Sequence, residues 1–179
     1  FDQHGRFDAF VHLWALGVEW QFYLLFPLIC VILKEKLKLT FENLGQLFLI
    51  LGFASYLYSA IRFTPGVDPT PVYYSSFARL YHFLIPAAVV FLFAKKPPRR
   101  IQLGLRYLLQ MLLLVALIVP FFTVHFDSLL LYYLIFPLYT LGATAYLWLT
   151  RDDRTPFFLK GEIWSAIAKR SYSLYLWQY

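Results

Sequence analysis

Cysteine and charged side chains are both scarce in this sequence. A single cysteine, Cys30, excludes a disulfide framework within the chain. Charged residues make up only 15% of the 179 residues, whereas 60% are hydrophobic and 21% are aromatic. A soluble domain of this length could not bury so many apolar side chains, and the mean hydropathy of +0.60 agrees with this argument. The composition therefore predicts a membrane protein.

Several motifs that would indicate other functions are also missing. The sequence contains no Ser-His-Asp or Cys-His pattern, no zinc-ligand spacing and no glycine-rich phosphate loop. We therefore expect no metal and no bound cofactor. The formal net charge is +6, but the basic residues fall in short clusters between apolar stretches, as in the loops of membrane proteins. Nucleic acid is therefore not an expected partner.

What the sequence does contain is a series of apolar stretches, each long enough to cross the roughly 30 Å hydrocarbon layer of a bilayer. Five full stretches span 12–33, 41–61, 77–94, 101–122 and 129–150, and a sixth begins near Trp164 and is cut off at Tyr179. We predict an all-α fold, a polytopic transmembrane helix bundle in an integral, multi-pass membrane protein. Because the first residues do not resemble a native N-terminus, we expect residues 1–179 to be an internal part of a single transmembrane domain.

The loops between these stretches differ in their content of lysine and arginine. Basic residues cluster in 34–40, 95–100 and 151–162 and are rare in 62–76 and 123–128. By the positive-inside rule, the first set of loops should be cytoplasmic and the second set outside. The basic residues of 95–100, which are followed by Arg106 inside the next stretch, could also attract anionic headgroups or the phosphates of a cofactor.

Glu19 is the one acidic residue well inside an apolar stretch. A charged residue at the centre of a membrane helix costs about 2.5 to 3.5 kcal/mol on insertion scales, so it usually faces a bundle interior or a wet cavity. At 3.6 residues per turn, His12 and Glu19 share one helix face. Both are candidate functional groups. The alternatives are a carboxyl that ties helices together and a histidine bonded to headgroups or to a backbone carbonyl.

A second polar group lies at the outer end of the third stretch. Arg79 and His82 project from one side of this helix, because they are three residues apart. The positive-inside rule gives no reason for an arginine at this end. One interpretation is that Arg79 extends to the outer interface. The other is that it binds an anion or a carboxylate, with Glu19 as the candidate partner.

Three segments resemble motifs of the acyltransferase-3 family of membrane enzymes. The first, "HLWALGVEWQFYLLFPL", matches the family signature at His12, Trp14, Leu16, Glu19, Gln21, Phe22 and Tyr23. The second, "YYSSFARLYHFLIPA", matches at Tyr74, Ser76 and Arg79. The third, "SYSLYLWQY", matches at Ser171, Tyr172, Ser173, Leu174, Tyr175 and Leu176. In this order, and with the apolar stretches between them, the three segments extend over nearly the whole chain.

The resemblance implies an integral-membrane O-acyltransferase. Its donor substrate would be acyl-CoA, its acceptor a hydroxyl of a sugar or lipid-like molecule, and its surroundings membrane lipids. Glu19 and Arg79 would orient substrates and stabilise charge, and His12 would line the cavity. The resemblance also implies a basic histidine in a helix that precedes residue 1. Substrate-binding roles are expected for a further set of residues: Trp14, Gln21, Tyr23, Ser76, His82 and Tyr175.

The chain also departs from the family pattern. Ala15, Trp20, Tyr81, His82, Pro86 and Gln178 stand where other residues are usual. A divergent, inactive homologue is therefore one alternative. Another is a proton-coupled transporter, in which Glu19, His12 and His82 relay protons and Arg79 binds an anionic substrate. No internal repeat of the kind found in many transporters is visible, which favours the enzyme. A purely structural membrane subunit would leave the intramembrane glutamate and arginine unexplained.

Overall fold

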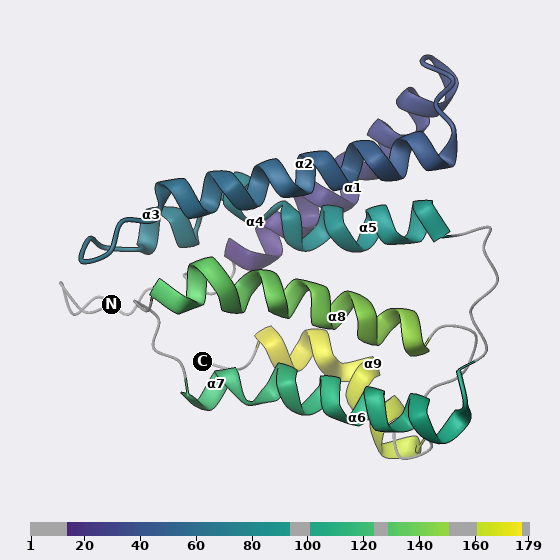
Figure 1. Ribbon diagram of the computed structural model, residues 1–179, viewed down its shortest axis with the longest axis vertical. Coiled ribbons are helices and arrows are strands. Elements are labelled where there is room, and N and C mark those ends of the chain that lie inside the picture. Colours follow the sequence, from purple (N-terminus) through teal and green to yellow (C-terminus); the bar gives the residue numbers. More distant parts are fainter. Residues whose placement is uncertain (1–13, 94–100, 124–128, 151–160, 177–179) are drawn as a thin grey trace.

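The computed structural model describes residues 14–93, 101–123, 129–150 and 161–176, and these are helical apart from short turns, with no strand among them. The elements are α1 (Trp14–Glu35), α2 (Phe41–Arg62), α3 (Thr70–Tyr73), α4 (Ser76–Arg79), α5 (Tyr81–Phe93), α6 (Leu103–Ile118), α7 (Pro120–Thr123), the π-helix η2 (Leu131–Ile135), α8 (Phe136–Thr150) and α9 (Glu162–Leu176). The predicted all-α fold is confirmed for these residues (Figure 1).

Each predicted apolar stretch contains a helix, but the helices differ in length. Two of the described helices, in the first and second stretches, are long and apolar enough to cross a membrane. Two others, α5 and α6, are apolar but shorter. With 13 residues, α5 extends only about 20 Å at 1.5 Å per residue. The number of spans therefore stays a prediction.

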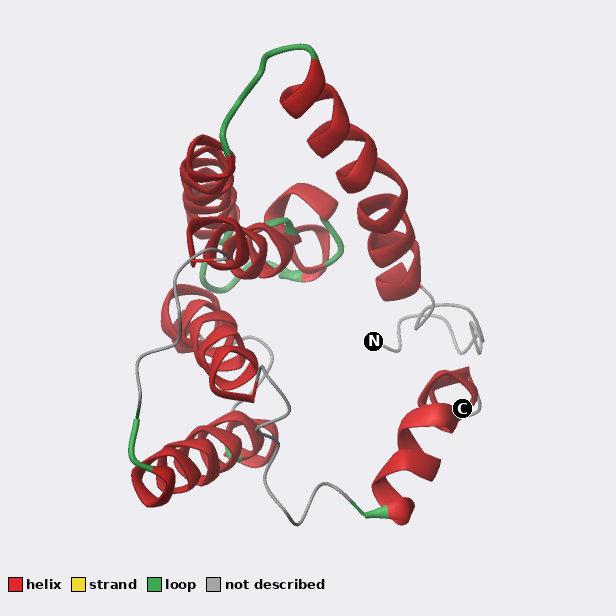
Figure 2. Ribbon diagram, turned by 90° about the vertical axis from the view of Figure 1, so that its right-hand side faces the viewer, coloured by secondary structure: helices red, strands yellow, loops and turns green. Residues whose placement is uncertain are grey.

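Four of the helices form a row in the order α2, α5, α8, α6, in which each helix contacts the next. Figure 2 shows α1 and α9 on one side of this row. Aromatic side chains join α1 to the row. The centre of the Phe22 ring lies 4.6 Å from that of Phe83 in α5. The centre of the Phe26 ring lies 5.0 Å from that of Phe48 in α2. The contact of Phe22 with Phe83 places the middle of α1 beside the start of α5.

The closest packing is between α2 and α5, and glycines on α2 make it possible. A Cβ atom added at Gly45 would lie 2.6 Å from Leu92 Cγ and 3.0 Å from the Leu92 backbone nitrogen. At Gly52 the same atom would lie 3.1 Å from Ile85 Cγ1. Small residues at a membrane-helix interface let backbones approach and increase van der Waals contact. The glycines therefore determine how near α5 lies to α2.

Replacing Gly45 with alanine should destabilise the protein, by about 1 to 3 kcal/mol as for other overpacked sites. The added methyl group forces α2 and α5 apart, since it meets backbone as well as side chain. Thermal unfolding in detergent measures the effect. Gly17→Ala is the control, because a Cβ at Gly17 in α1 meets nothing within 4 Å. Alanine should leave stability unchanged or raise it there. Equal melting shifts for the two variants would contradict this packing argument.

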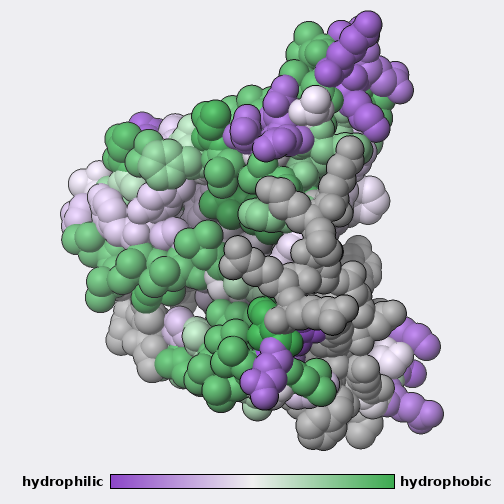
Figure 3. All heavy atoms as spheres, turned by 45° about the vertical axis from the view of Figure 1, so that its right-hand side comes forward, coloured by the Kyte–Doolittle hydropathy of each residue, from purple (hydrophilic) through white to green (hydrophobic). Residues whose placement is uncertain are grey.

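The ends of the helices agree with the alternation of basic loops. One end of the bundle contains the ends of α1, α5 and α8 and the starts of α2 and α6 (Figure 1). The other end contains α3, α7 and the last turn of α2. The apolar surface lies between these ends, and hydrophilic side chains gather mainly away from it in Figure 3. The assignment of the first end to the cytoplasm stays a prediction.

Candidate functional site

The candidate site begins at α4, a single helical turn that ends with Arg79. The backbone N–H of Ala78 donates to Ser75 Oγ at 3.4 Å, which caps the turn. Ser55 of α2, which is buried, then fixes the turn from the side. Its hydroxyl donates to the Phe77 carbonyl at 2.6 Å and accepts from the Tyr81 N–H at 3.0 Å. Because the two bonds lie on either side of Arg79, α2 sets the position of this arginine.

The guanidinium group of Arg79 lies between two aromatic rings. Its central carbon is 4.3 Å from the centre of the Tyr73 ring and 4.5 Å from the centre of the Phe136 ring. Arg79 Nε donates to the Tyr73 carbonyl at 3.1 Å. Cation–π contacts of this kind are attractive and also hold the planar group in one orientation. Arg79 is therefore fixed by α3 on one side and by α8 on the other.

The turn before α3 places Tyr73. Asp68 Oδ1 accepts hydrogen bonds from the Thr70 backbone N–H at 3.0 Å and from the Thr70 hydroxyl at 2.6 Å. These two bonds lower the pKa of the exposed Asp68 carboxyl, since they favour its charged form. They also start the helical turn that ends in Tyr73.

His82 joins Arg79 to α8. Its Nε2 lies 3.3 Å from Arg79 Nη1, and its Nδ1 is bonded to Thr140 Oγ1. Thr140 donates its own hydroxyl proton to the Phe136 carbonyl at 3.0 Å, so it accepts the proton of His82 Nδ1. This network assigns the Nδ1–H tautomer to His82, with Nε2 accepting from the guanidinium group. One ring nitrogen of His82 therefore contacts Arg79, and the other anchors the ring to α8.

The π-helix η2 has a local cause in Pro137. Proline lacks an N–H group, so the Tyr133 carbonyl four residues earlier loses its usual helical partner. The Tyr56 hydroxyl of α2 donates to this carbonyl at 2.9 Å. Single π-helical turns occur frequently at functional sites. Here the widened turn contains Tyr132.

Tyr132 is the most unusual residue at the site. Its ring stacks on the Phe63 ring, with 4.1 Å between the ring centres, and the whole residue is only 2% exposed. Its hydroxyl is buried and has no hydrogen-bond partner among the described residues. The Tyr132 ring centre lies 5.4 Å from that of Phe136, the ring that contacts the Arg79 guanidinium. Since a buried polar group without a partner is costly, Tyr132 is a candidate to bind a substrate atom beside Arg79.

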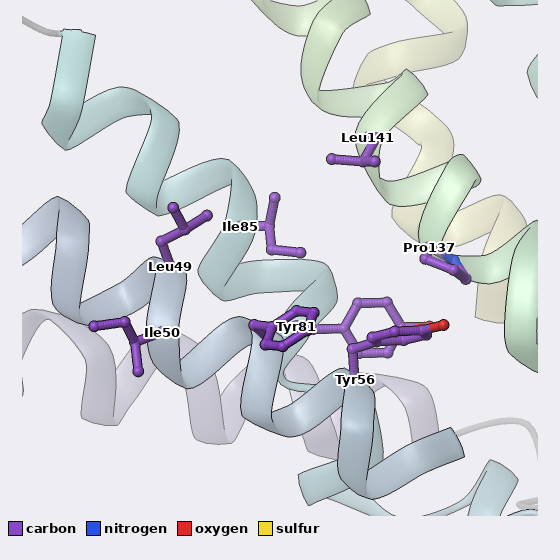
Figure 4. Close-up of a pocket in the computed structure, with 8 residues that line it drawn as sticks. Leu49, Ile50, Tyr56, Tyr81, Ile85, Pro137 and Leu141 are labelled. Atoms are coloured by element: carbon purple, nitrogen blue, oxygen red, sulfur yellow. The ribbon is translucent and has the colours of Figure 1, made fainter. Parts of the chain in front are cut away.

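An apolar groove lies behind this polar cluster, with a volume of about 570 Å³ (Figure 4). Tyr81 separates the two, because it lines the groove and its ring centre is 4.0 Å from that of His82. Aliphatic and aromatic side chains of α2, α5 and α8 form the walls: Leu49, Ile50, Phe53, Tyr56, Ile85, Pro137 and Leu141. Apolar walls of this kind favour contact with a hydrocarbon chain, whereas the polar cluster beside the groove supplies hydrogen-bond donors.

The structure brings Arg79 and His82 together but does not pair Arg79 with Glu19. Glu19 is half-buried on α1, one turn before Phe22, and so lies toward the end of the bundle that holds Arg79. No ion pair joins the two within the described part of the chain; the partners of Arg79 named above are aromatic rings, a carbonyl and His82. The role of Glu19 stays a prediction.

The other residues expected at the site have varied positions. Ser76 is half-buried at the start of α4, whereas Gln21 and Tyr23 are exposed on α1. His12 and the side chains of Trp14 and Tyr175 lie outside the described residues. No three metal-ligating side chains come together among the described residues. The expectation of no metal stays a prediction.

Sequence analysis missed Tyr132, Phe136 and Thr140, which all come from the fifth apolar stretch. One signal in the sequence pointed to them. Pro137 interrupts an otherwise regular helix, and Thr140 follows one turn later as a polar residue in an apolar run. The residues that they contact lie far away in the sequence: Arg79 is 57 residues before Phe136, and His82 is 58 residues before Thr140. Only folding brings them into contact.

Comparison with known proteins identifies the family. The profile of the family described as "Acyltransferase domain", acyltransferase-3, matches residues 2–179. The chain belongs to the acyltransferase-3 family. The predicted resemblance is thereby confirmed.

Two relatives illustrate the similarity. A Staphylococcus aureus (strain COL) protein named "Putative O-acetyltransferase" is 29% identical over 195 aligned residues, which cover 100% of this chain and 30% of the relative. The peptidoglycan O-acetyltransferase OatA of Listeria monocytogenes is 32% identical over 91 residues, 51% of this chain and 14% of its own. The chain thus spans less than a third of these relatives. No solved structure matches it.

Proposed function

We propose that this acyltransferase-3 chain is part of a multi-pass membrane O-acyltransferase, which moves an acetyl or other short acyl group from acyl-CoA to a hydroxyl acceptor. One observation carries the proposal. The Arg79 guanidinium is held between two rings, and one of them, Phe136, also contacts the ring of Tyr132, whose buried hydroxyl has no hydrogen-bond partner among the described residues. These are two preorganised donors in an apolar bundle, as stabilisation of a developing negative charge requires.

The chemistry of acyl transfer gives these donors a task. The acceptor oxygen attacks the thioester carbonyl carbon, the C–S bond breaks, and coenzyme A leaves as a thiolate while the acceptor proton passes to a base. At the tetrahedral stage the former carbonyl oxygen bears a negative charge. We assign Arg79 and Tyr132 to stabilise that oxygen, and Glu19 to orient substrate at the same end of the bundle.

His82 does not serve as the base in this proposal. Its Nε2 accepts from Arg79 and its Nδ1 is bonded to Thr140, so no basic lone pair faces a substrate. His82 is therefore a positioning residue for Arg79. We assign the base to a histidine in a helix before residue 1, as the family resemblance implies, because a neutral imidazole can accept the hydroxyl proton.

The acceptor proposed here is a carbohydrate. The Listeria monocytogenes relative is named for peptidoglycan, so a peptidoglycan-type glycan is the first acceptor to test. The donor would enter from the cytoplasm, at the end of the bundle where the basic loops lie, and its acyl carbonyl would have to reach the end that holds Arg79, where the acceptor would lie.

The test uses the complete gene product in proteoliposomes, with acetyl-CoA labelled on its acetyl group and a peptidoglycan oligosaccharide. We expect label on the oligosaccharide as an alkali-labile ester, with an equal amount of free coenzyme A thiol. Movement of acceptor or protons across the membrane without ester formation would support the transporter. Neither transfer nor flux would support an inactive homologue.

A further inference from the structure

The first turn of α6 is open and lacks a side-chain cap. Its N-cap residue, Gln102, makes no capping hydrogen bond, and residues 102–105 are exposed. A Cβ atom added at Gly104 would meet no atom of the described residues within 4 Å. The first backbone N–H groups of a helix have no partner within the helix, and together with its dipole they attract anions. A helix start alone does not define a site.

Arg106 supplies the second observation. Its side chain is only 4% exposed, and its Nε is buried without a hydrogen-bond partner in the described part of the chain. Side chains of a helix lean toward its N-terminus, so this cation leans toward the open turn. A buried charge is costly where the described residues offer its Nε no acceptor, and a cation in the first turn also opposes the helix dipole. A bound anion would remove both penalties.

A contact with α8 does not replace such an anion. Gln110, one turn after Arg106, donates from Nε2 to the Leu149 carbonyl at 3.2 Å and so ties α6 to the last turn of α8. Arg106 is therefore near the negative end of the α8 dipole, which offsets part of its charge. Arg106 Nε still has no acceptor among the described residues.

We propose that the first turn of α6 and Arg106 form a binding site for a phosphate group. An arginine fork matches two phosphate oxygens, and the free N–H groups of the turn can bind a third. The phosphate belongs either to the headgroup of an anionic lipid at this end of the bundle or to a soluble phosphorylated molecule such as coenzyme A. Basic residues just before the helix, at 95–100, raise the local concentration of both.

Binding rather than activity tests this site, so its outcome does not depend on the proposed acyl transfer. The complete protein is placed in vesicles of phosphatidylcholine alone or mixed with phosphatidylglycerol, and retained lipid is counted by native mass spectrometry. In a second arm, thermal unfolding in phosphatidylcholine is measured with and without coenzyme A. A lipid site predicts preferential retention of phosphatidylglycerol, and a soluble-ligand site predicts a coenzyme A-dependent rise in the melting temperature.

Arg106→Gln should weaken the binding of whichever ligand the wild-type protein binds by about tenfold or more, as expected for loss of a charge-assisted hydrogen bond. Arg106→Lys should keep part of the binding, because it retains the charge. Arg62→Gln is the control, because Arg62 is exposed in the last turn of α2, at the end of the bundle opposite the start of α6. This variant should bind as the wild-type protein does. The proposal is overturned if wild-type protein responds in neither arm, or if Arg62→Gln loses as much binding as Arg106→Gln. If Arg106→Gln does not fold, the comparison of Arg106→Lys with wild type tests the site, and binding unchanged in every folded Arg106 variant also overturns the proposal.

Discussion

Arg79→Lys is expected to lower kcat/KM for acyl transfer by about 10²- to 10³-fold, the loss seen when one preorganised oxyanion donor is removed. Lysine keeps the charge but not the planar group that stacks between Tyr73 and Phe136, nor the Nε donor to the Tyr73 carbonyl. Steady-state transfer from labelled acetyl-CoA, measured with the complete protein in proteoliposomes, gives the rate.

Arg62→Lys is the matched control for this substitution. Arg62 lies in the last turn of α2, at the same end of the bundle as Arg79, but it is exposed. It should transfer at the wild-type rate. Full activity of Arg79→Lys would show that charge alone is needed and that the aromatic clamp has no catalytic role.

The same assay decides what Glu19 does. If Glu19 and Arg79 act on one transition state, Glu19→Ala and Arg79→Ala each abolish transfer, and the double variant is little worse than either. Losses that simply add would show that the two residues act independently, in keeping with the absence of an ion pair between them in the described structure.

Tyr132→Phe is expected to lower kcat/KM by about 10- to 100-fold without destabilising the protein. The Tyr132 hydroxyl has no partner among the described residues, so its removal breaks no hydrogen bond and abolishes a desolvation cost. If the hydroxyl donates to the developing oxyanion, its loss reduces transition-state stabilisation alone. The measurement is transfer rate together with thermal unfolding of the same sample.

Tyr146→Phe controls for the removal of a buried hydroxyl. Tyr146 lies in α8, almost four turns after Tyr132, and its hydroxyl is likewise buried without a partner in the described structure. This variant should keep both rate and stability. The assignment of Tyr132 fails if its variant transfers at the wild-type rate, or if both variants lose activity equally.

The sequence by itself determined the all-helical class of this protein and the approximate positions of its longer helices, although the helix predicted at 77–94 is divided at Leu80 into α4 and α5. Apolar runs have the length and composition of membrane helices, and these local properties do not depend on the rest of the fold. The motif around Glu19 and the segment ending in Arg79 also identified the family, because both are contiguous in sequence. Glu19 was the expected carboxylate partner of Arg79 because both residues lie at outer helix ends. This weaker argument did not determine which side chains are in contact.

Only the tertiary structure decided what surrounds Arg79. The ring of Phe136, the bond from His82 to Thr140 and the buried Tyr132 hydroxyl come from a stretch that the sequence marks only as apolar. Their position follows from close packing of α5 against α8 and from the widened turn before Pro137, whose freed carbonyl is bonded by Tyr56 of α2. Contacts between residues so far apart in the chain depend on how helices pack, which helical periodicity does not specify.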